Sequence, residues 1–299
     1  MGGEQNLSLV SFVRVKNPDN RTLKEAIKES LDKIEFDFDR KVGKLVIKPN
    51  MCYYYHPSTG DVTDPLFVSA LIDVLRENFP GNHEILIAEA DASAMKCRYS
   101  FGILGYDKIA DEKGIKLVNL SEEKSRTVEV KINGLDFQFH IPEIFSDSNF
   151  VVNVPKIKYM SGSRISCALK NMFGCNAHAR KSVYHVALHE AIVVMNKLVR
   201  TDLVVVDGLF VVGRSTKQLN LVMASKDPVA VDVAASKMLG INPQRVQQIV
   251  SASKEGIGKM DFRPVGDFDY FRKAFPKRTF KDNARAKAAS IYLRVLKGE

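Results

Sequence analysis

Short apolar segments alternate with amphipathic segments along most of this chain, and this order constrains the fold more than any other feature. Strands are predicted at residues 9–15, 44–47, 84–88, 115–120, 150–154, 203–206 and 219–224. Between them, apolar residues recur at helical spacing, as over residues 22–34 and 183–199. Strands that alternate with helices predict an α/β fold, with a mostly parallel central sheet and helices on both faces.

Turn and capping residues refine this prediction. Asp64-Pro65 and Asp227-Pro228 each indicate the start of a helix, because aspartate caps free amides and proline suits the first helical position. Asn133-Gly134 is a strong two-residue turn signal and predicts a β-hairpin over residues 127–141. We expect this hairpin to be an antiparallel addition at one edge of the sheet.

The stretch 149–175 combines a buried strand with a run of basic and polar residues. Its strand ends at Pro155, because proline has no amide to donate to a ladder. Ser161-Gly162-Ser163 predicts a turn and the N-cap of a helix over residues 164–173. Free amides at such a helix terminus, with Lys156 and Lys158 beside them, favour a bound anion. The simpler alternative is a connector with solvated lysines.

Polar side chains follow most of the predicted strands, and open parallel sheets bind ligands beyond the carboxyl ends of their strands. Lysines at this edge would neutralise an anion, and amide or hydroxyl groups would orient it. We therefore predict an enzyme that binds a small anionic ligand, a phosphate or a carboxylate. The plain alternative is that strand ends are polar because they meet water. The predicted ligand-binding residues are Lys48, Asn50, Lys156, Lys158, Ser161, Ser163, Lys170 and Asn171.

Carboxylates at the same edge allow two further roles. Glu89, Asp91 and Asp207 carry the oxygen ligands that magnesium-like ions prefer, so a divalent cation is a candidate cofactor. Asp91, Asp207 and His185 are candidate catalytic residues, because burial can shift the pKa of such groups toward a value suited to proton transfer. His185 and His189 also stand four apart, a spacing that can place two imidazoles on one metal.

Four cysteines leave two alternatives open. They follow predicted strands, so they could meet in space and hold an iron–sulfur cluster or zinc. They form no Cys-x-x-Cys pair, so inert buried thiols are the expected outcome and an iron–sulfur cluster within this chain is disfavoured. So few cysteines in 299 residues indicate a reducing compartment. These residues are Cys52, Cys97, Cys167 and Cys175.

The net charge of +9 is concentrated at the C-terminal end. Residues 271–299 contain nine basic and two acidic side chains, a net +7, which leaves +2 for the rest of the chain. We expect a core domain over residues 1–255 and a basic extension over 256–299. The extension supports a second hypothesis, a nucleic-acid or ribosome-associated protein, because lysine and arginine bind phosphate backbones. No apolar run is long enough to span a bilayer and no signal peptide is evident, so a cytoplasmic location without a membrane partner is expected.

Several motifs together resemble one known family. They are Lys48-Pro49-Asn50, residues 154–158 and 169–175, His185, Val206-Asp207-Gly208 and the run from Ser225 to Asp232. In this order they resemble the family called domain of unknown function 362, over about residues 40–265. The resemblance implies an iron–sulfur partner protein for some members, because members are often joined to ferredoxin-type modules. This chain lacks the ferredoxin cysteines, and a segment without the family's glycine- and proline-rich loop follows Gly208.

Overall fold

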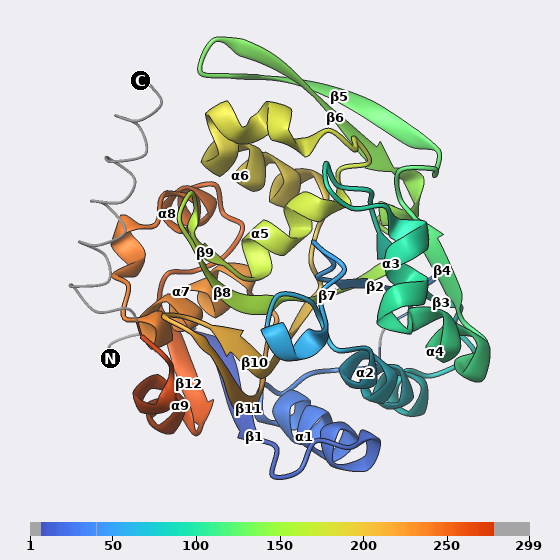
Figure 1. Ribbon diagram of the computed structural model, residues 1–299, viewed down its shortest axis with the longest axis vertical. Coiled ribbons are helices and arrows are strands. Elements are labelled where there is room, and N and C mark those ends of the chain that lie inside the picture. Colours follow the sequence, from blue (N-terminus) through green and yellow to red (C-terminus); the bar gives the residue numbers. More distant parts are fainter. Residues whose placement is uncertain (1–6, 40, 278–299) are drawn as a thin grey trace.

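The computed structural model describes residues 7–39 and 41–277. Within them, ten strands form one mixed sheet with the order β12-β1-β11-β10-β7-β2-β3-β4, and β8 pairs with β10 and β9 off this path (Figure 1). The strands of this sheet are β1 Ser8–Arg14, β2 Leu45–Pro49, β3 Ile85–Glu89, β4 Lys116–Asn119, β7 Phe150–Val154, β8 Lys156–Met160, β9 Arg164–Ser166, β10 Leu203–Val212, β11 Thr216–Ser225 and β12 Phe262–Gly266.

Helices cover both faces of the sheet, as predicted. One core cluster joins the sheet to α1–α4, and the other joins it to α5–α9. Neighbouring residues of β10 show why both faces are apolar, since Val204 packs into one cluster and Val205 into the other. The helices are α1 Asn20–Lys33, α2 Pro65–Asn78, α3 Cys97–Leu104, α4 Tyr106–Lys113, α5 Ala168–Met172, α6 Leu188–Leu198, α7 Pro228–Leu239, α8 Gln247–Lys254 and α9 Phe268–Ala274.

The parallel part of the sheet sets the position of the site. Strands β10, β7, β2, β3 and β4 run parallel as neighbours, so their carboxyl ends share one edge. Lys48 of β2 is level with Asn153 of β7 across this edge. The predicted caps of α2 and α7 are confirmed, because the Asp64 side chain accepts from Leu66 N and the Asp227 side chain accepts from Val229 N. The α/β fold with a mostly parallel core is therefore confirmed.

The predicted helix over residues 164–173 is wrong. Residues 161–163 form a turn between β8 and β9, and Arg164 has a positive φ of 63° that a helix does not allow. Tyr159 then pairs with Ile165 in an antiparallel hairpin. The helix that follows, α5, is only five residues long and begins at Ala168, so the predicted anion site at a helix terminus beside Ser161-Gly162-Ser163 does not form.

Two other boundaries differ from prediction. The hairpin, β5 Ser125–Ile132 and β6 Leu135–Pro142, turns at Asn133-Gly134 as expected, but it forms its own two-stranded sheet and does not extend the main one. It packs over the helices of one face, and Phe139 and Ile141 are buried there. The predicted strand at 203–206 continues through Asp207 to Val212, because it pairs with β11 from Val204 to Val212.

The main sheet continues past the boundary expected at residues 256–258. Strand β12 pairs in parallel with β1, and α9 packs Phe271 and Phe275 into the core. The described part of the predicted extension, up to Lys277, is thus integral to the core. Residues 278–299, with most of the basic tail, lie outside the described residues.

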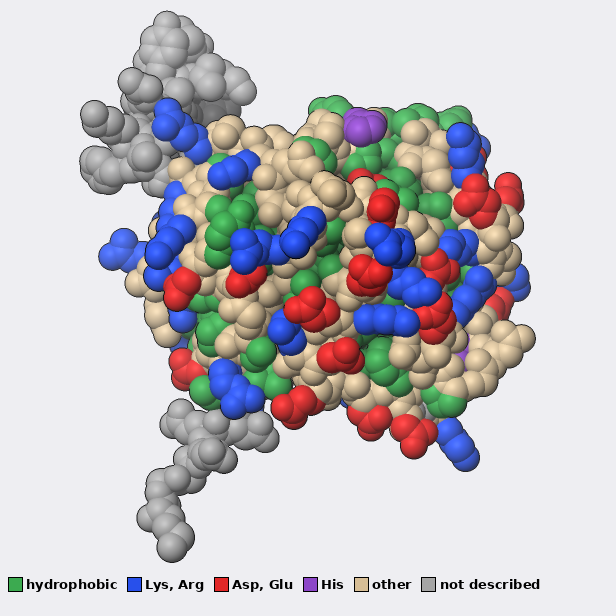
Figure 2. All heavy atoms as spheres, turned by 90° about the horizontal axis from the view of Figure 1, so that it is seen from below, with side chains coloured by type: hydrophobic (Ala, Val, Ile, Leu, Met, Phe, Trp, Pro, Cys, Tyr) green, Lys and Arg blue, Asp and Glu red, His purple; other side chains and the backbone are tan. Residues whose placement is uncertain are grey.

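The surface is mixed in charge. On the face drawn in Figure 2, basic and acidic side chains intermingle instead of gathering in separate fields. Exposed ion pairs such as Lys44–Glu84 and Lys116–Glu84 are typical of the described surface. Over residues 7–39 and 41–277, the search for a helix of sufficient length and apolarity to cross a bilayer finds none.

Candidate functional site

A buried ion pair joins the ends of β2 and β3. The Nζ of Lys48 lies 2.7 Å from Glu89 Oε2 and also donates to the carbonyl oxygen of Pro49. Glu89 accepts two further hydrogen bonds, from Met51 N and Ala90 N. Both side chains of the pair are almost fully buried, at 1% and 4% exposure. Such a pair is tolerated because every strong acceptor of the carboxylate is occupied.

An amide clamp and a glycine hold this pair in place. Asn171 donates to the carbonyl oxygen of Lys48 and to Asn153 Oδ1, so α5 is fixed to β2 and β7. Gly174 lies against the pair, and a Cβ there would be 3.0 Å from the Nζ of Lys48. Two residues of this segment therefore help to position Lys48: Asn171 binds its carbonyl oxygen, and Gly174 leaves room for its ammonium group.

A second buried pair lies where β8 meets β10. Lys156 Nζ is 3.0 Å from Asp207 Oδ1, and both side chains are essentially inaccessible. Asp207 also accepts from the backbone amides of Asp64 and Leu209. Burial raises the pKa of Asp64, and the nearby Asp207 carboxylate raises it further. Neither Lys156 nor Asp207 lines the cavity described in the next paragraph.

A cavity of about 310 Å³ opens at the carboxyl ends of the parallel strands. Its charged lining consists of four lysines and two carboxylates, a net charge of +2 with His185 neutral. Segments far apart in the chain supply these groups: β2, β3, β8, α5, the loop 50–61 and the 3₁₀ segment Lys181–Ala187. The charged, amide, cysteine and imidazole side chains in the lining are Lys48, Asn50, Cys52, Asp61, Glu89, Lys158, Lys170, Asn171, Lys181 and His185.

Besides Lys48, two further lining lysines are held by hydrogen bonds to the protein. Lys158 donates to the carbonyl oxygen of Asp61 at 2.8 Å and contacts Cys52 Sγ at 3.3 Å. Lys181 donates to the carbonyl oxygen of Asp91. These acceptors are neutral, so the hydrogen bonds position both ammonium groups without neutralising their charge.

Lys170 differs from the other lining lysines. Its side chain is only partly exposed, and it makes no hydrogen bond or ion pair with any residue that the structure describes. Burial lowers the pKa of Lys170, and the charge of Lys158 lowers it further. Burial likewise lowers the pKa of Lys181 to about 8, with Lys48 adding to the effect and Glu89 opposing it. The cavity thus holds positive charge that the surrounding protein leaves uncompensated.

Besides Lys156 and Asp207, the predicted residues Asp91, Ser161 and Ser163 also lie away from the cavity lining. Asp91 accepts from Lys96 and from the amide of Cys97, and these bonds outweigh its burial and lower its pKa. Ser161 is exposed in the β8–β9 turn, and Ser163 donates to the carbonyl oxygen of Ile165. Asp91 and Ser163 therefore make local structural contacts, and Ser161 lies on the surface.

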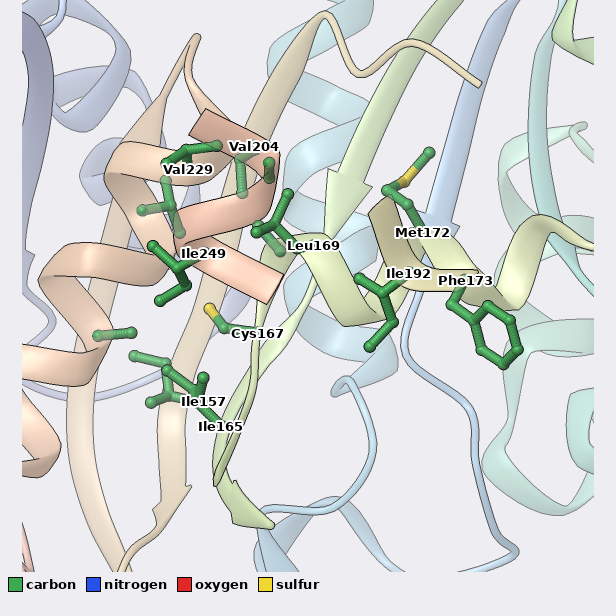
Figure 3. Close-up of a cluster of buried hydrophobic side chains, with 14 of the residues drawn as sticks. Ile157, Ile165, Cys167, Leu169, Met172, Phe173, Ile192, Val204, Val229 and Ile249 are labelled. Atoms are coloured by element: carbon green, nitrogen blue, oxygen red, sulfur yellow. The ribbon is translucent and has the colours of Figure 1, made fainter. Parts of the chain in front are cut away.

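The carboxylates and cysteines do not come together as a metal centre. Across residues 7–39 and 41–277, no group of three or more His, Cys, Asp or Glu side chains is placed to hold a metal ion. Cys167 belongs to an apolar cluster with Leu169 and Ile249 (Figure 3). Burial raises the pKa of the thiols of Cys97, Cys167 and Cys175, the last to about 12, so all three are protonated at neutral pH.

His185 and His189 also take separate roles. His185 is exposed and lines the cavity from the 3₁₀ segment, whereas His189, on α6, contacts Gln248 Oε1 at 2.7 Å through Nδ1. The two-imidazole spacing assumed one continuous helix, but residues 181–187 are 3₁₀ and the α-helix begins at Leu188. That change of helix type redirects side chains that are four residues apart.

Sequence reasoning missed Lys181 and Asp61 as lining residues. Lys181 follows no predicted strand. Asp61 lies in a loop with several tyrosines, and the sequence does not indicate which side of the sheet this loop covers. The signal for Lys181 was its neighbourhood, since it comes six residues after Cys175 and just before the predicted helix at 183–199. Ser182 and His185, from the same segment as Lys181, also line the cavity.

Comparison with known proteins places the chain in a family. The family described as domain of unknown function, DUF362, matches residues 45–237, so the chain belongs to it. The match includes both buried ion pairs and the whole cavity lining. A thylakoid-associated protein of Synechocystis sp. is 22% identical over 234 residues, which cover 74% of this chain and 70% of that protein.

Two solved structures are distantly similar. A crystal structure of a Thermotoga maritima protein aligns with a TM-score of 0.42 at 10% identity, covering 81% of this chain and 60% of that one. The lactate racemase apoprotein of Thermoanaerobacterium thermosaccharolyticum aligns with a TM-score of 0.44 at 11% identity, covering 79% and 58%. The chain thus spans about three fifths of each solved chain.

Proposed function

We propose that this protein is an enzyme that binds a small anionic ligand, a phosphate or a carboxylate, in the cavity at the strand ends. One observation carries the proposal: Lys170 is held in the cavity with no hydrogen-bond or ion-pair partner among the described residues. Enclosing an ammonium group without a partner costs free energy, and a bound anion would recover it. The net charge of +2 in the lining also favours a negatively charged ligand.

The other lining groups suit this ligand. Lys158 and Lys181 are oriented by neutral acceptors and keep their charge for a ligand. Asn50 presents an amide at the same edge, and His185 at the exposed side is available for proton transfer. Lys48 is neutralised by Glu89, so it shapes the floor of the cavity and adds little charge to it.

Calorimetric titration at low ionic strength tests the proposal. Inorganic phosphate, oxalate and malonate are titrated into the full chain, and we expect at least one to bind with a one-to-one ratio. Replacing Lys170 with Met should weaken that binding at least tenfold, because a charge-assisted hydrogen bond is lost. Lys108, exposed on α4 outside the cavity, provides the matched control, and Lys108→Met should bind like the unmodified chain.

Two results would contradict the proposal. The first is the absence of measurable binding of any of the three anions at millimolar concentration. The second is equal weakening in Lys170→Met and Lys108→Met, because it would mean that only the overall charge of the protein matters. Malonate and phosphate differ in shape, so their relative affinities also distinguish a carboxylate site from a phosphate site.

A further inference from the structure

The four lysines of the cavity differ in what their nitrogen atoms already do. Lys48 donates to Glu89 and to Pro49 O, Lys158 donates to Asp61 O, and Lys181 donates to Asp91 O. Lys170 makes no such bond to a described residue. Conversion of a lysine amine to an imine removes its N–H donors, so the first three would each lose fixed hydrogen bonds. Lys170 would lose none.

We propose that Lys170 forms an imine with the carbonyl group of a small oxo acid whose carboxylate binds in the same cavity. This inference rests on the proposed function, and it specifies the ligand as a carboxylate that also carries an aldehyde or ketone. Lys158 lies close enough for its charge to act on Lys170, so it can hold the carboxylate while the neighbouring amine meets the carbonyl carbon.

The surroundings of Lys170 also favour the reactive form of its amine. Only the neutral amine is a nucleophile, and a lysine becomes neutral more readily when it is desolvated or placed next to another cation. Both conditions hold here, since burial and the charge of Lys158 lower the pKa of Lys170. Lys108 on α4 is exposed, so it lacks this enclosure.

The step balances without an oxidant or a reductant. The lone pair of Lys170 Nζ attacks the carbonyl carbon, a C–N bond forms, and the carbonyl oxygen takes up a proton to give a carbinolamine. The C–O bond then breaks, and the oxygen leaves as water with the two hydrogens that the amine nitrogen gives up. His185 and Lys181 line the cavity and can move these protons.

Reductive trapping tests the inference on the unmodified chain. The protein is incubated with pyruvate, glyoxylate or 2-oxoglutarate and sodium cyanoborohydride, and its intact mass and peptide map are recorded. We expect one adduct per chain, equal in mass to the oxo acid less one oxygen atom, on the peptide that contains Lys170. Its yield should exceed that at any exposed lysine at least tenfold.

Variants and competitors separate the possible outcomes. Lys170→Arg should abolish the adduct, Lys108→Arg should not change it, and malonate should protect against it. Calorimetric binding of malonate without any preferred adduct overturns the imine and leaves anion binding intact. An adduct that maps to Lys158 or Lys181 also overturns it. The absence of both binding and adduct rejects the imine and the proposed function together. Mapping on the unmodified chain makes the result independent of whether a variant folds.

Discussion

Two lysines of β8, two residues apart, have different environments. Lys156 points to β10 and lies against Asp207 in a fully buried pair. Lys158, two residues on, faces the cavity, where its partners are a carbonyl oxygen and a thiol. Lys170 completes the contrast, because it faces the same cavity with no partner among the described residues. Lysines near one edge of the sheet thus have two roles: Lys156 on β8 is neutralised inside the protein, whereas Lys158 on β8 and Lys170 on α5 line a cavity without a carboxylate partner.

This difference shows that the partner of a lysine at this edge of the sheet decides whether the lysine stabilises the fold or can bind a ligand. A lysine paired with a buried carboxylate serves the fold, because removal of either charge leaves the other unpaired. A lysine with neutral partners, or none, keeps a charge that a ligand can use. Substitutions that separate loss of stability from loss of binding therefore test the distinction directly.

The largest expected effect is the loss of stability when the buried pair of Lys156 and Asp207 is broken. Lys156→Met keeps the length of the side chain but leaves the Asp207 carboxylate buried without its cation. We expect the free energy of unfolding to fall by about 3–5 kcal/mol, a large share of a typical total. Urea unfolding followed by circular dichroism measures this loss.

An exposed pair provides the control for that measurement. Asp269 and Arg272 are both largely exposed on α9, so Asp269→Ala should have a much smaller effect. If Lys156→Met costs no more than this control, the pair of Lys156 and Asp207 is not a structural element, and the contrast with the cavity lysines is lost.

The next effect concerns pH and the cavity. Burial lowers the pKa of Lys181 to about 8, so this amine is protonated at pH 7 and mostly neutral at pH 9. An anion prefers the protonated amine, so binding above pH 8 requires proton uptake and becomes weaker. We expect the affinity for malonate, which does not titrate in this range, to fall about tenfold between pH 7 and pH 9.

Arginine at the same position sharpens this prediction. Lys181→Arg keeps its charge at both pH values, so its affinity should fall less than that of the unmodified chain. Lys108→Arg should behave like the unmodified chain, because Lys108 lies outside the cavity. An identical pH dependence in all three proteins would show that Lys181 does not contribute to the anion site.

Much of the fold and part of the site could be predicted from sequence. The alternation of apolar and amphipathic segments was enough for the α/β class, since both faces of the sheet are covered. The convergence of Lys48 and Glu89 followed from the parallel strands β2 and β3, whose carboxyl ends share an edge. Lys158 on β8 and Lys170 on α5 line the same cavity, as predicted from the sequence. Local pattern and chain direction carry this information, and both are properties of sequence.

The separation of Lys156 from Lys158 could not be predicted. Residues two apart on a strand point to the same side, so the spacing favours a shared environment. In the structure, the register between β8 and β10 shifts, and Lys156 is level with Asp207 while Lys158 is level with Val212. Such an irregularity depends on how two distant strands pair. The same holds for Ser161 and Ser163, because pairing of β8 with β9 makes a turn of the segment predicted to cap a helix.

The smallest expected effect on stability is that of Lys170→Met. Comparing it with Lys156→Met tests whether the two lysines have different roles. Lys170→Met is chemically the same change as Lys156→Met, but it leaves no described group without a partner and removes the cost of enclosing a charge. We therefore expect the free energy of unfolding to change by less than about 1 kcal/mol, or to rise. Urea unfolding of both variants side by side gives the answer. If the two substitutions destabilise equally, Lys170 supports the fold and is not free for a ligand. If Lys170→Met is stable and no longer binds malonate, stability and binding reside in different lysines at the same edge of the sheet.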